Sequence, residues 1–560
     1  MHIDENRRRF VEIADRILHT IWQSGPVWAT LNGIHEYDHT LGDLSADGFC
    51  RCARTFKAYV EALQSEVNPD LLDPEEATDY HVALSLASSS LIALDSQRLW
   101  MSDPSLYAST AIWGCFGLLT RDFAPYEERL RLMLDRMREI PDALMLSRGN
   151  ISHPPSVFVQ AALEVTQAGL SFFRNAVPRI AESAPVLHSE LLAANDAAAS
   201  AFEAYEEWLR KAVLPNADGD FAAGCDVYQQ LLLAEHWLTY SPNDLVLLGE
   251  RVLSETIEQI KEVAGSIDPS VTWQELVESL KKDHPPKDGL VQAYREAMES
   301  ARDFVVERDL VTILPTEHLE VSETPEFERP MLPYAAYFPP APFEAGRDAL
   351  LWVTPIDGSL PEDRQQAQLL GHCTYTIPMI ALHEGYPGHH VQLTRAFDSP
   401  SALRRQALSN LTVEGWALYC ERMMHEQGFY SDPRVRLFQL KGLLWRACRV
   451  IIDVGLHAGD MTLDDAVRML VEVARLEEVN ALTEVRRYTI TPTQPMSYVI
   501  GKLLILDLRD QMKQRLGGSF DLKAFHDRLL DCGSIPLPLI LQKMLSETAR
   551  ERPAPLRRSA

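Results

Sequence analysis

The chain has 560 residues, a formal net charge of −27 and a pI of about 5.1. An acidic balance of this size disfavours nucleic acid and anionic membrane surfaces as partners, and we expect neither. The length allows a large buried core and two or three domains.

The 8 cysteines are scattered through segments with a helical pattern and show no C-x-x-C spacing. This distribution favours reduced thiols over a disulfide framework. The N-terminal segment carries charge where a signal peptide needs an apolar core, and no run of about 18 apolar residues occurs. The sequence therefore predicts a cytoplasmic protein without a membrane span.

Amphipathic patterns with a helical period follow one another from residue 5 to about 310. We therefore predict a helical N-terminal lobe over residues 1–312. Clusters of Gly, Pro, Asp, Asn and Ser interrupt the pattern and predict helix ends. They lie at 25–26, 68–70, 152–155 and 241–244.

The composition and the hydrophobic pattern change after residue 312. We therefore predict that a catalytic lobe begins there, over residues 313–560. Prolines gather there, at Pro330, Pro333, Pro339, Pro340 and Pro342. The segment 349–354 that follows is apolar and β-branched, which predicts a strand. Helical patterns resume at Pro361 and continue to about Arg550.

The segment HEGYPGHH, residues 383–390, follows an apolar run. A His-Glu pair followed by further histidines is how zinc hydrolases place two metal ligands beside a general base. In the common H-E-x-x-H form the second ligand stands four residues after the first. Here that position is Pro387, which cannot bind a metal, so the motif is a stretched one.

In a straight helix His383 and His390 would share a face but stand roughly 10 Å apart along the axis. Two zinc bonds of about 2 Å cannot span that distance. The helix must therefore bulge or break at Pro387-Gly388. With two residues looped out, His389 takes the place of the missing ligand, and His390 is the alternative. If Pro-Gly simply ends a helix, these histidines are ordinary core or surface groups.

The segment 410–421 predicts a helix with Glu414 and Glu421 on one face. Zinc peptidases with a glutamate as third ligand usually carry it on the helix after the histidines, which favours Glu414. Glu421 could instead orient a ligand histidine. A solvated acidic face is the alternative, but Trp416 and Tyr419 beside the carboxylates favour burial.

Arg449, Asp453 and His457 recur every four residues in an otherwise apolar helical pattern. Such a stripe is either a structural ion-pair network or the wall of an active site. In the second case Asp453 could fix the tautomer of His457, which could then donate to a developing oxyanion.

Four motifs follow one another in the second half of the chain: HEGYPGHH, EGWALYCE, RVIIDVGLH and RRYTITPTQPMSYVIGK. In this order they resemble the motifs of a large bacterial family, domain of unknown function 885, with a stretched HExxPGHH motif. That family is placed among the zincin-like metallopeptidases. The resemblance covers most of the chain and is sharpest from about Tyr334 to Gln511. It implies a mainly α, zincin-like fold with a deep central cleft and a small β-sheet beside the metal-binding helix.

Related zincins use a C-terminal tyrosine to hydrogen-bond the tetrahedral intermediate and a basic residue to hold a substrate carboxylate. The resemblance therefore assigns the first role to Tyr498 and the second to Arg487. Tyr488 and Lys502 are the reserves. Arg487 and Tyr488 precede a Thr/Pro loop, a common place for substrate-binding groups.

These observations predict a zinc-dependent hydrolase of amide bonds in short peptides. One Zn²⁺ per chain would be held by His383, His389 and Glu414, with Glu384 as general base. Two alternatives stay open. The first is a dedicated zinc amidohydrolase that acts on a non-peptide amide in a biosynthetic or detoxification pathway, and the second is a non-catalytic helical scaffold.

Overall fold

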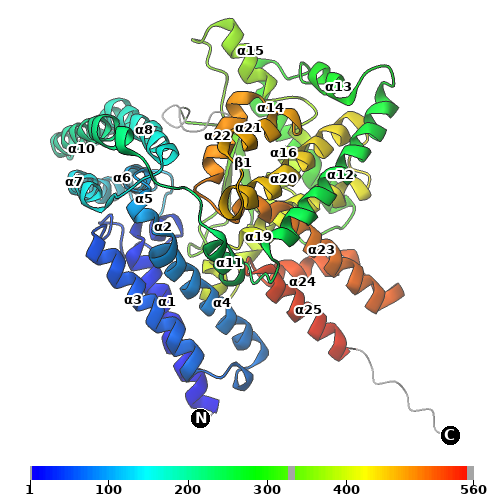
Figure 1. Ribbon diagram of the computed structural model, residues 1–560, viewed down its shortest axis with the longest axis horizontal. Helices are drawn as coiled ribbons and strands as arrows, with labels where there is room; N and C mark the ends of the chain where they lie inside the picture. The colour runs from blue at the N-terminus through cyan, green and yellow to red at the C-terminus, as the bar shows by residue number, and fades with distance from the viewer. Residues whose placement is uncertain (1–2, 326–328, 330–334, 552–560) are drawn as a thin grey trace. The chain divides into compact units, whose positions relative to one another are not determined.

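The computed structural model describes residues 3–325, 329 and 335–551 (Figure 1). The predicted prolines Pro330 and Pro333, and Tyr334, lie outside the described residues. Over the described residues the protein is mainly α-helical with one small sheet of three strands, as predicted. In the described ranges, no helix is both long enough and apolar enough to cross a bilayer.

Contacts divide the chain into two compact units. Among the described residues, unit 1 comprises 3–231, 325, 329 and 341–346. Unit 2 comprises 232–324, 335–340 and 347–551.

Unit 1 is built from helices joined by short loops and single turns. They are α1 (Ile3–Ser24), α2 (Pro26–Leu31), α3 (Ala46–Glu66), α4 (Pro74–Leu91), α5 (Leu99–Ser102), α6 (Ser105–Phe116), α7 (Tyr126–Asn150), α8 (Ser156–Ser171), α9 (Val177–Glu182) and α10 (His188–Trp208). Helix α11 (Cys225–Ala234) runs across the division between the units.

Unit 2 holds the sheet and the remaining helices. They are α12 (Pro242–Ile267), α13 (Trp273–Leu280), α14 (Leu290–Glu307), β1 (His318–Glu323), β2 (Ala335–Phe338), β3 (Asp348–Val353), α15 (Glu362–Leu370), α16 (Ile377–Glu384), α17 (His389–Ala396), α18 (Ala402–Gln406), α19 (Asn410–Glu426), α20 (Pro433–Ala458), α21 (Leu463–Glu472), α22 (Glu478–Tyr488), α23 (Gln494–Leu516), α24 (Leu522–Asp531) and α25 (Leu537–Glu551).

The four predicted interruptions of the N-terminal pattern all coincide with helix boundaries. Side-chain capping explains two of the helix starts near them. Asp73 caps α4 and Ser241 caps α12, and each forms a reciprocal capping box with the residue three positions later. Proline follows each cap at the first helical position, where its missing N–H costs nothing.

The division into units falls at residue 231, whereas the sequence pattern changes at 312. Packing explains the difference. Helix α12 runs along α20, and α14 packs on α16 (Figure 1). The residues from 232 to 312 therefore belong to unit 2, although their amphipathic pattern continues that of the N-terminal helices. Buried side chains such as Ile260, Val277, Leu437 and Leu444 form a core between α12, α13 and α20.

The sheet has the order β1-β3-β2, with β1 parallel and β2 antiparallel to the central strand. The predicted strand at 349–354 is β3, which begins and ends one residue earlier. Strand β2 lies against α17, because Tyr337 packs on the cluster of Leu393, Ala396 and Phe397. The sheet therefore lies beside the helix that begins at His389.

Candidate metal centre

The HEGYPGHH segment is a helix break. Helix α16 ends at Glu384, the Tyr386–Pro387 peptide bond is cis, and α17 begins at His389. The chain folds back so closely that a Cβ on Gly388 would stand 1.9 Å from the carbonyl oxygen of His383. Only glycine fits there. The break brings the start of α17 back to the end of α16.

Helix α19 holds this break in place. The indole Nε1 of Trp416 donates a 2.8 Å hydrogen bond to the carbonyl of Pro387. The Cys420 thiol donates to the same carbonyl at 3.7 Å. Both side chains are fully buried, so the looped-out residues are fixed from the helix that also carries Glu414.

Two imidazoles and a carboxylate converge at the break. The Nε2 atoms of His383 and His389 lie 3.9 and 3.4 Å from Glu414 Oε2. The two rings are nearly perpendicular, at 88°, with centroids 4.8 Å apart. Both Nε2 atoms therefore face one carboxylate oxygen. No described residue hydrogen-bonds to that oxygen, although it is buried.

Glu384 reaches the same point. One of its carboxylate oxygens and one nitrogen of each imidazole, His383 and His389, lie within 4.8 Å of one another. Its side chain is half-buried, whereas both histidines are buried. Two carboxylates, Glu384 and Glu414, thus flank the histidine pair.

Glu421 fixes the first imidazole from behind. His383 Nδ1 donates a 2.9 Å hydrogen bond to Glu421 Oε1, and the carboxylate is fully buried. Gln439 Nε2 donates to the other oxygen at 3.1 Å, and an Arg446 nitrogen lies 3.5 Å from Oε1. With Nδ1 engaged in this way, Nε2 of His383 is free to face Glu414.

Tyr498 stands next to this cluster. Its ring lies nearly parallel to that of His383, at 16° and 6.5 Å between centroids. A close crossing of α19 and α23 makes this possible, since Gly415 meets Gly501 so tightly that a Cβ on Gly501 would stand 2.1 Å from the carbonyl of Leu411. The Arg449 guanidinium lies over the Tyr498 ring at 4.0 Å.

The carboxylates dominate the electrostatics. Burial by itself lowers the pKa of His383, but Glu414 and Glu421 outweigh it and raise the pKa to about 9. Burial raises the pKa of Glu414, yet the two imidazoles hold it well below its ordinary value. The space between the two imidazoles and Glu414 therefore favours a positive charge, whether it comes from a proton or from a metal ion.

Burial and the Glu414 carboxylate raise the pKa of Tyr498, even though Arg449 opposes them. The phenol therefore keeps its proton at neutral pH. It stands at the cluster as a hydrogen-bond donor.

From residue 26 to residue 544 the sequence matches the model of the family described as "Bacterial protein of unknown function (DUF885)". The chain belongs to the DUF885 family. No curated protein matches the sequence.

Two solved structures resemble this DUF885 protein over nearly the whole chain. The first, from Shewanella oneidensis, is described as "a putative lipoprotein of unknown function". It has 26% identity and a TM-score of 0.80, with 96% of this chain and 99% of that chain covered. The second, from Colwellia psychrerythraea, is described as a "putative lipoprotein". It has 18% identity and a TM-score of 0.83, with 98% of this chain and 100% of that chain covered. The second likeness concerns the fold alone.

In this DUF885 protein His390 points to a different set of partners from His389. Its Nε2 contacts the Glu317 carboxylate, and Nδ1 lies 3.1 Å from the Tyr337 hydroxyl. Tyr386 also donates to Glu317, at 2.8 Å. Because both ring nitrogens of His390 are engaged, the structure brings His389, and not His390, to the cluster.

The Arg449, Asp453 and His457 stripe organises the segment before α23. Asp453 accepts hydrogen bonds from the backbone N–H groups of Thr493 and Met496, at 3.1 and 3.3 Å. His457 Nε2 donates to the carbonyl of Tyr488 at 2.9 Å. That nitrogen is therefore engaged with the backbone and not turned to an oxyanion, while Arg449 reaches the cluster through Tyr498.

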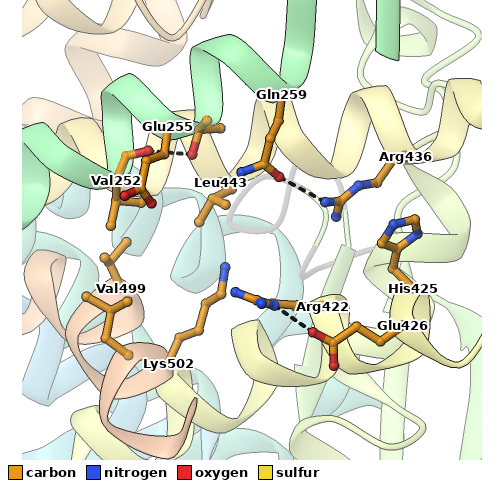
Figure 2. A pocket seen from close by; sticks show the side chains of 12 residues that line it. Val252, Glu255, Gln259, Arg422, His425, Glu426, Arg436, Leu443, Val499 and Lys502 are labelled. Atoms are coloured by element: carbon orange, nitrogen blue, oxygen red, sulfur yellow. Dashed lines mark hydrogen bonds and ion pairs between the residues drawn. The ribbon is translucent and has the colours of Figure 1, made fainter. Parts of the chain in front are cut away.

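Each predicted substrate-binding residue has neighbours outside the cluster of His383, His389 and Glu414. Arg487 is exposed and pairs with Glu484 at 2.8 Å. Tyr488 is fully buried, and its hydroxyl accepts from Trp445 Nε1 at 3.1 Å. Lys502 is buried and lines a separate cavity with Arg422 (Figure 2).

Sequence reasoning missed three residues around the cluster: Glu317, Gln439 and Arg446. A usable signal existed for two of them, because Arg446 lies three residues before Arg449 and Gln439 lies seven before Arg446, so both extend the polar stripe of α20. Glu317 stands in a loop just before β1 and belongs to no motif, so nothing in its neighbourhood in the sequence distinguishes it.

Proposed function

We propose that the protein is a zinc-dependent hydrolase of amide bonds in short peptides. The observation that carries the proposal is the convergence of His383 Nε2 and His389 Nε2 on Glu414 Oε2, at 3.9 and 3.4 Å. Two neutral nitrogen ligands and one carboxylate, with a position left for water, form a common catalytic zinc site.

The donor set fits the metal in three respects. Glu414 Oε2 is a buried acceptor to which no described residue hydrogen-bonds, and a cation would satisfy it. His383 has a carboxylate on its Nδ1, the partner that zinc-bound histidines usually have. The ligands stand on three different helices, α16, α17 and α19, so packing fixes them.

Of the two carboxylates, we assign Glu414 as ligand and Glu384 as general base. Glu414 faces both Nε2 atoms, and its side chain is only 15% exposed. Glu384 is half-buried and directly follows a ligand, so it stands beside the position left for water. This is the arrangement of a metallohydrolase base.

A zinc ion in this site would supply a Lewis acid for water and for the amide carbonyl. The Glu384 carboxylate takes a proton from the attacking water and later returns it to the leaving amine. Tyr498 donates a hydrogen bond to the carbonyl oxygen as that oxygen gains charge. The C–O bond forms and the C–N bond breaks without a covalent link to the protein.

The proposal extends to a zincin-like fold with a deep central cleft. It is supported by the stretched motif on a broken helix, by the glutamate on the next long helix and by β2 lying beside α17. A substrate backbone could add to such a short sheet as a further strand.

We also propose a cytoplasmic location. The eight cysteines are unpaired, and five of them are buried, as suits a reducing compartment. Fractionation of the native host, with an antibody to detect the protein, tests the location. Protein found in the envelope fraction would contradict a cytoplasmic location.

The test is hydrolysis of a mixed dipeptide and tripeptide library by the zinc-loaded protein. Wild type should release free amines, and Glu384→Gln should lose activity by at least about 100-fold while keeping its metal. Silence of wild type on all peptides, with metal bound, would contradict the peptidase assignment. It would leave an amidohydrolase acting on a non-peptide amide.

A further inference from the structure

A polar cavity in unit 2 lies between α12, α19, α20 and α23 (Figure 2). It has a volume of about 310 Å³. None of the candidate ligands of the metal centre is among its lining residues, which are mostly polar. The cavity therefore needs an explanation of its own.

Three cations face this cavity: Lys502, Arg422 and Arg436. In Figure 2 the Lys502 ammonium and the Arg422 guanidinium point into the same space, and Arg436 approaches from across it. Like charges brought together in this way repel one another and raise the cost of folding unless an anion lies between them.

Lys502 is the decisive residue. Only 5% of it is exposed, yet no described residue forms a hydrogen bond or ion pair with its ammonium. Burial, together with Arg422, lowers the pKa of Lys502 to about 7. The ammonium therefore opens onto the cavity without a partner among the described residues, and a bound anion would offset the cost of holding its charge there.

The two arginines keep donors free for such a ligand. Arg422 uses Nε for Glu426, at 2.8 Å, and the charge of Glu426 is already shared with Arg509, at 2.7 Å. Arg436 gives Nη1 to Gln439 and Nη2 to the Gln259 amide oxygen at 3.2 Å, both neutral partners. Neither contact with Arg436 supplies a negative charge.

Glu255 is the other carboxylate of the lining. It is exposed, and in Figure 2 it lies near Val252, away from Arg422 and Arg436. Against three cations the lining thus presents one solvated carboxylate and one whose charge Arg509 already shares. The buried Glu421 carboxylate also acts on Lys502 and Arg436, but His383 and Arg446 already share its charge. Cations therefore outnumber the carboxylates that are free to balance them.

We propose that this cavity binds a small molecule through a carboxylate or phosphate group held by Lys502, Arg422 and Arg436. Guanidinium groups present paired N–H donors that match both kinds of oxyanion, and lysine adds a point charge. The volume suits a compact metabolite and not a polymer. The proposal does not depend on the hydrolase activity.

Isothermal titration of the full-length protein with inorganic phosphate, and separately with succinate, tests the proposal and distinguishes the two sources of the oxyanion. At least one of them should bind saturably. Lys502→Met should weaken that binding by at least about tenfold, and Arg422→Gln should do the same. Arg422 is half exposed, so its variant should fold even if the Lys502 variant does not.

Two matched variants complete the design. Lys441→Met removes a second lysine, which is half-buried and whose pKa burial lowers to about 8, but which does not line the cavity. His389→Gln removes a candidate metal ligand. Both should bind the anion within about twofold of wild type. No binding of either anion, undiminished binding in Arg422→Gln, or binding lost in His389→Gln instead would overturn the proposal.

Discussion

Glu421 and His383 form a 2.9 Å hydrogen bond deep inside the protein, between two side chains that are 0% and 7% exposed. The bond engages Nδ1 and leaves Nε2 directed toward Glu414. A buried carboxylate in this position fixes the tautomer and the orientation of the imidazole. The candidate metal centre thus depends on a residue that would touch neither metal nor substrate.

Replacing Glu421 by Gln should weaken zinc affinity by about 10- to 100-fold, because the imidazole loses its carboxylate partner. Competition with a chromogenic zinc chelator measures this directly. Glu426→Gln is the matched control, five residues further along α19 and paired with Arg509. Equal affinity in both variants would mean that Glu421 serves packing only.

Tyr498→Phe should lower kcat by about 100- to 1000-fold with little change in KM, since the lost donor acts on charge that develops in the transition state. Zinc content should stay at the wild-type level. Tyr430→Phe removes a buried hydroxyl to which no described residue hydrogen-bonds, so its kinetics should match wild type. An unchanged kcat in Tyr498→Phe would remove Tyr498 from the mechanism.

Gly501→Ala should destabilise the protein by about 1–3 kcal/mol, because the new methyl would overlap the Leu411 carbonyl and Gly415. Urea denaturation measures the loss. Gly149→Ala is the comparison, a helical glycine in α7 with nothing within 4 Å of the added Cβ. It should be neutral or gain up to about 1 kcal/mol. Equal stability of the two variants would show that α19 and α23 do not cross this closely.

The stability of unit 1 should depend on pH through His35. Burial lowers its pKa, but Asp38 and Glu344 outweigh burial and raise the pKa to about 9. Because the folded-state value lies above the unfolded one of about 6.5, the stabilisation is complete below pH 6.5 and disappears as the pH rises through 9.

Relative to wild type, His35→Gln should therefore cost up to about 3 kcal/mol at pH 6 and much less at pH 10. Paired urea titrations at the two pH values give the difference. A cost that is the same at both values would show that His35 is not held protonated by its carboxylates.

Local chemistry made part of this structure predictable. The caps at Asp73 and Ser241 and the break at Pro387-Gly388 follow from a few adjacent residues. The helical period correctly places Glu414 and Glu421 on one side of α19. The break at Pro387-Gly388 also explains why His389, and not His390, reaches the cluster, because it shifts the helical register by two positions.

The rest depends on contacts between distant parts of the chain. Glu317 meets His390 only because the loop before β1 folds beside α17. Lys502 shares a motif with Tyr498, yet it faces Arg422 and Arg436 because it stands one turn further along α23. No periodicity within a single helix indicates which helices will surround it, so neither contact could be predicted from the sequence.

The central claim is that His383, His389 and Glu414 hold one zinc ion per chain. Elemental mass spectrometry of the purified protein, with His389→Gln beside His390→Gln, tests it most directly. We expect about one zinc per chain in wild type and in His390→Gln, and little in His389→Gln. A wild-type protein that stays free of metal after incubation with zinc, or a His389→Gln variant that keeps its zinc, would contradict it.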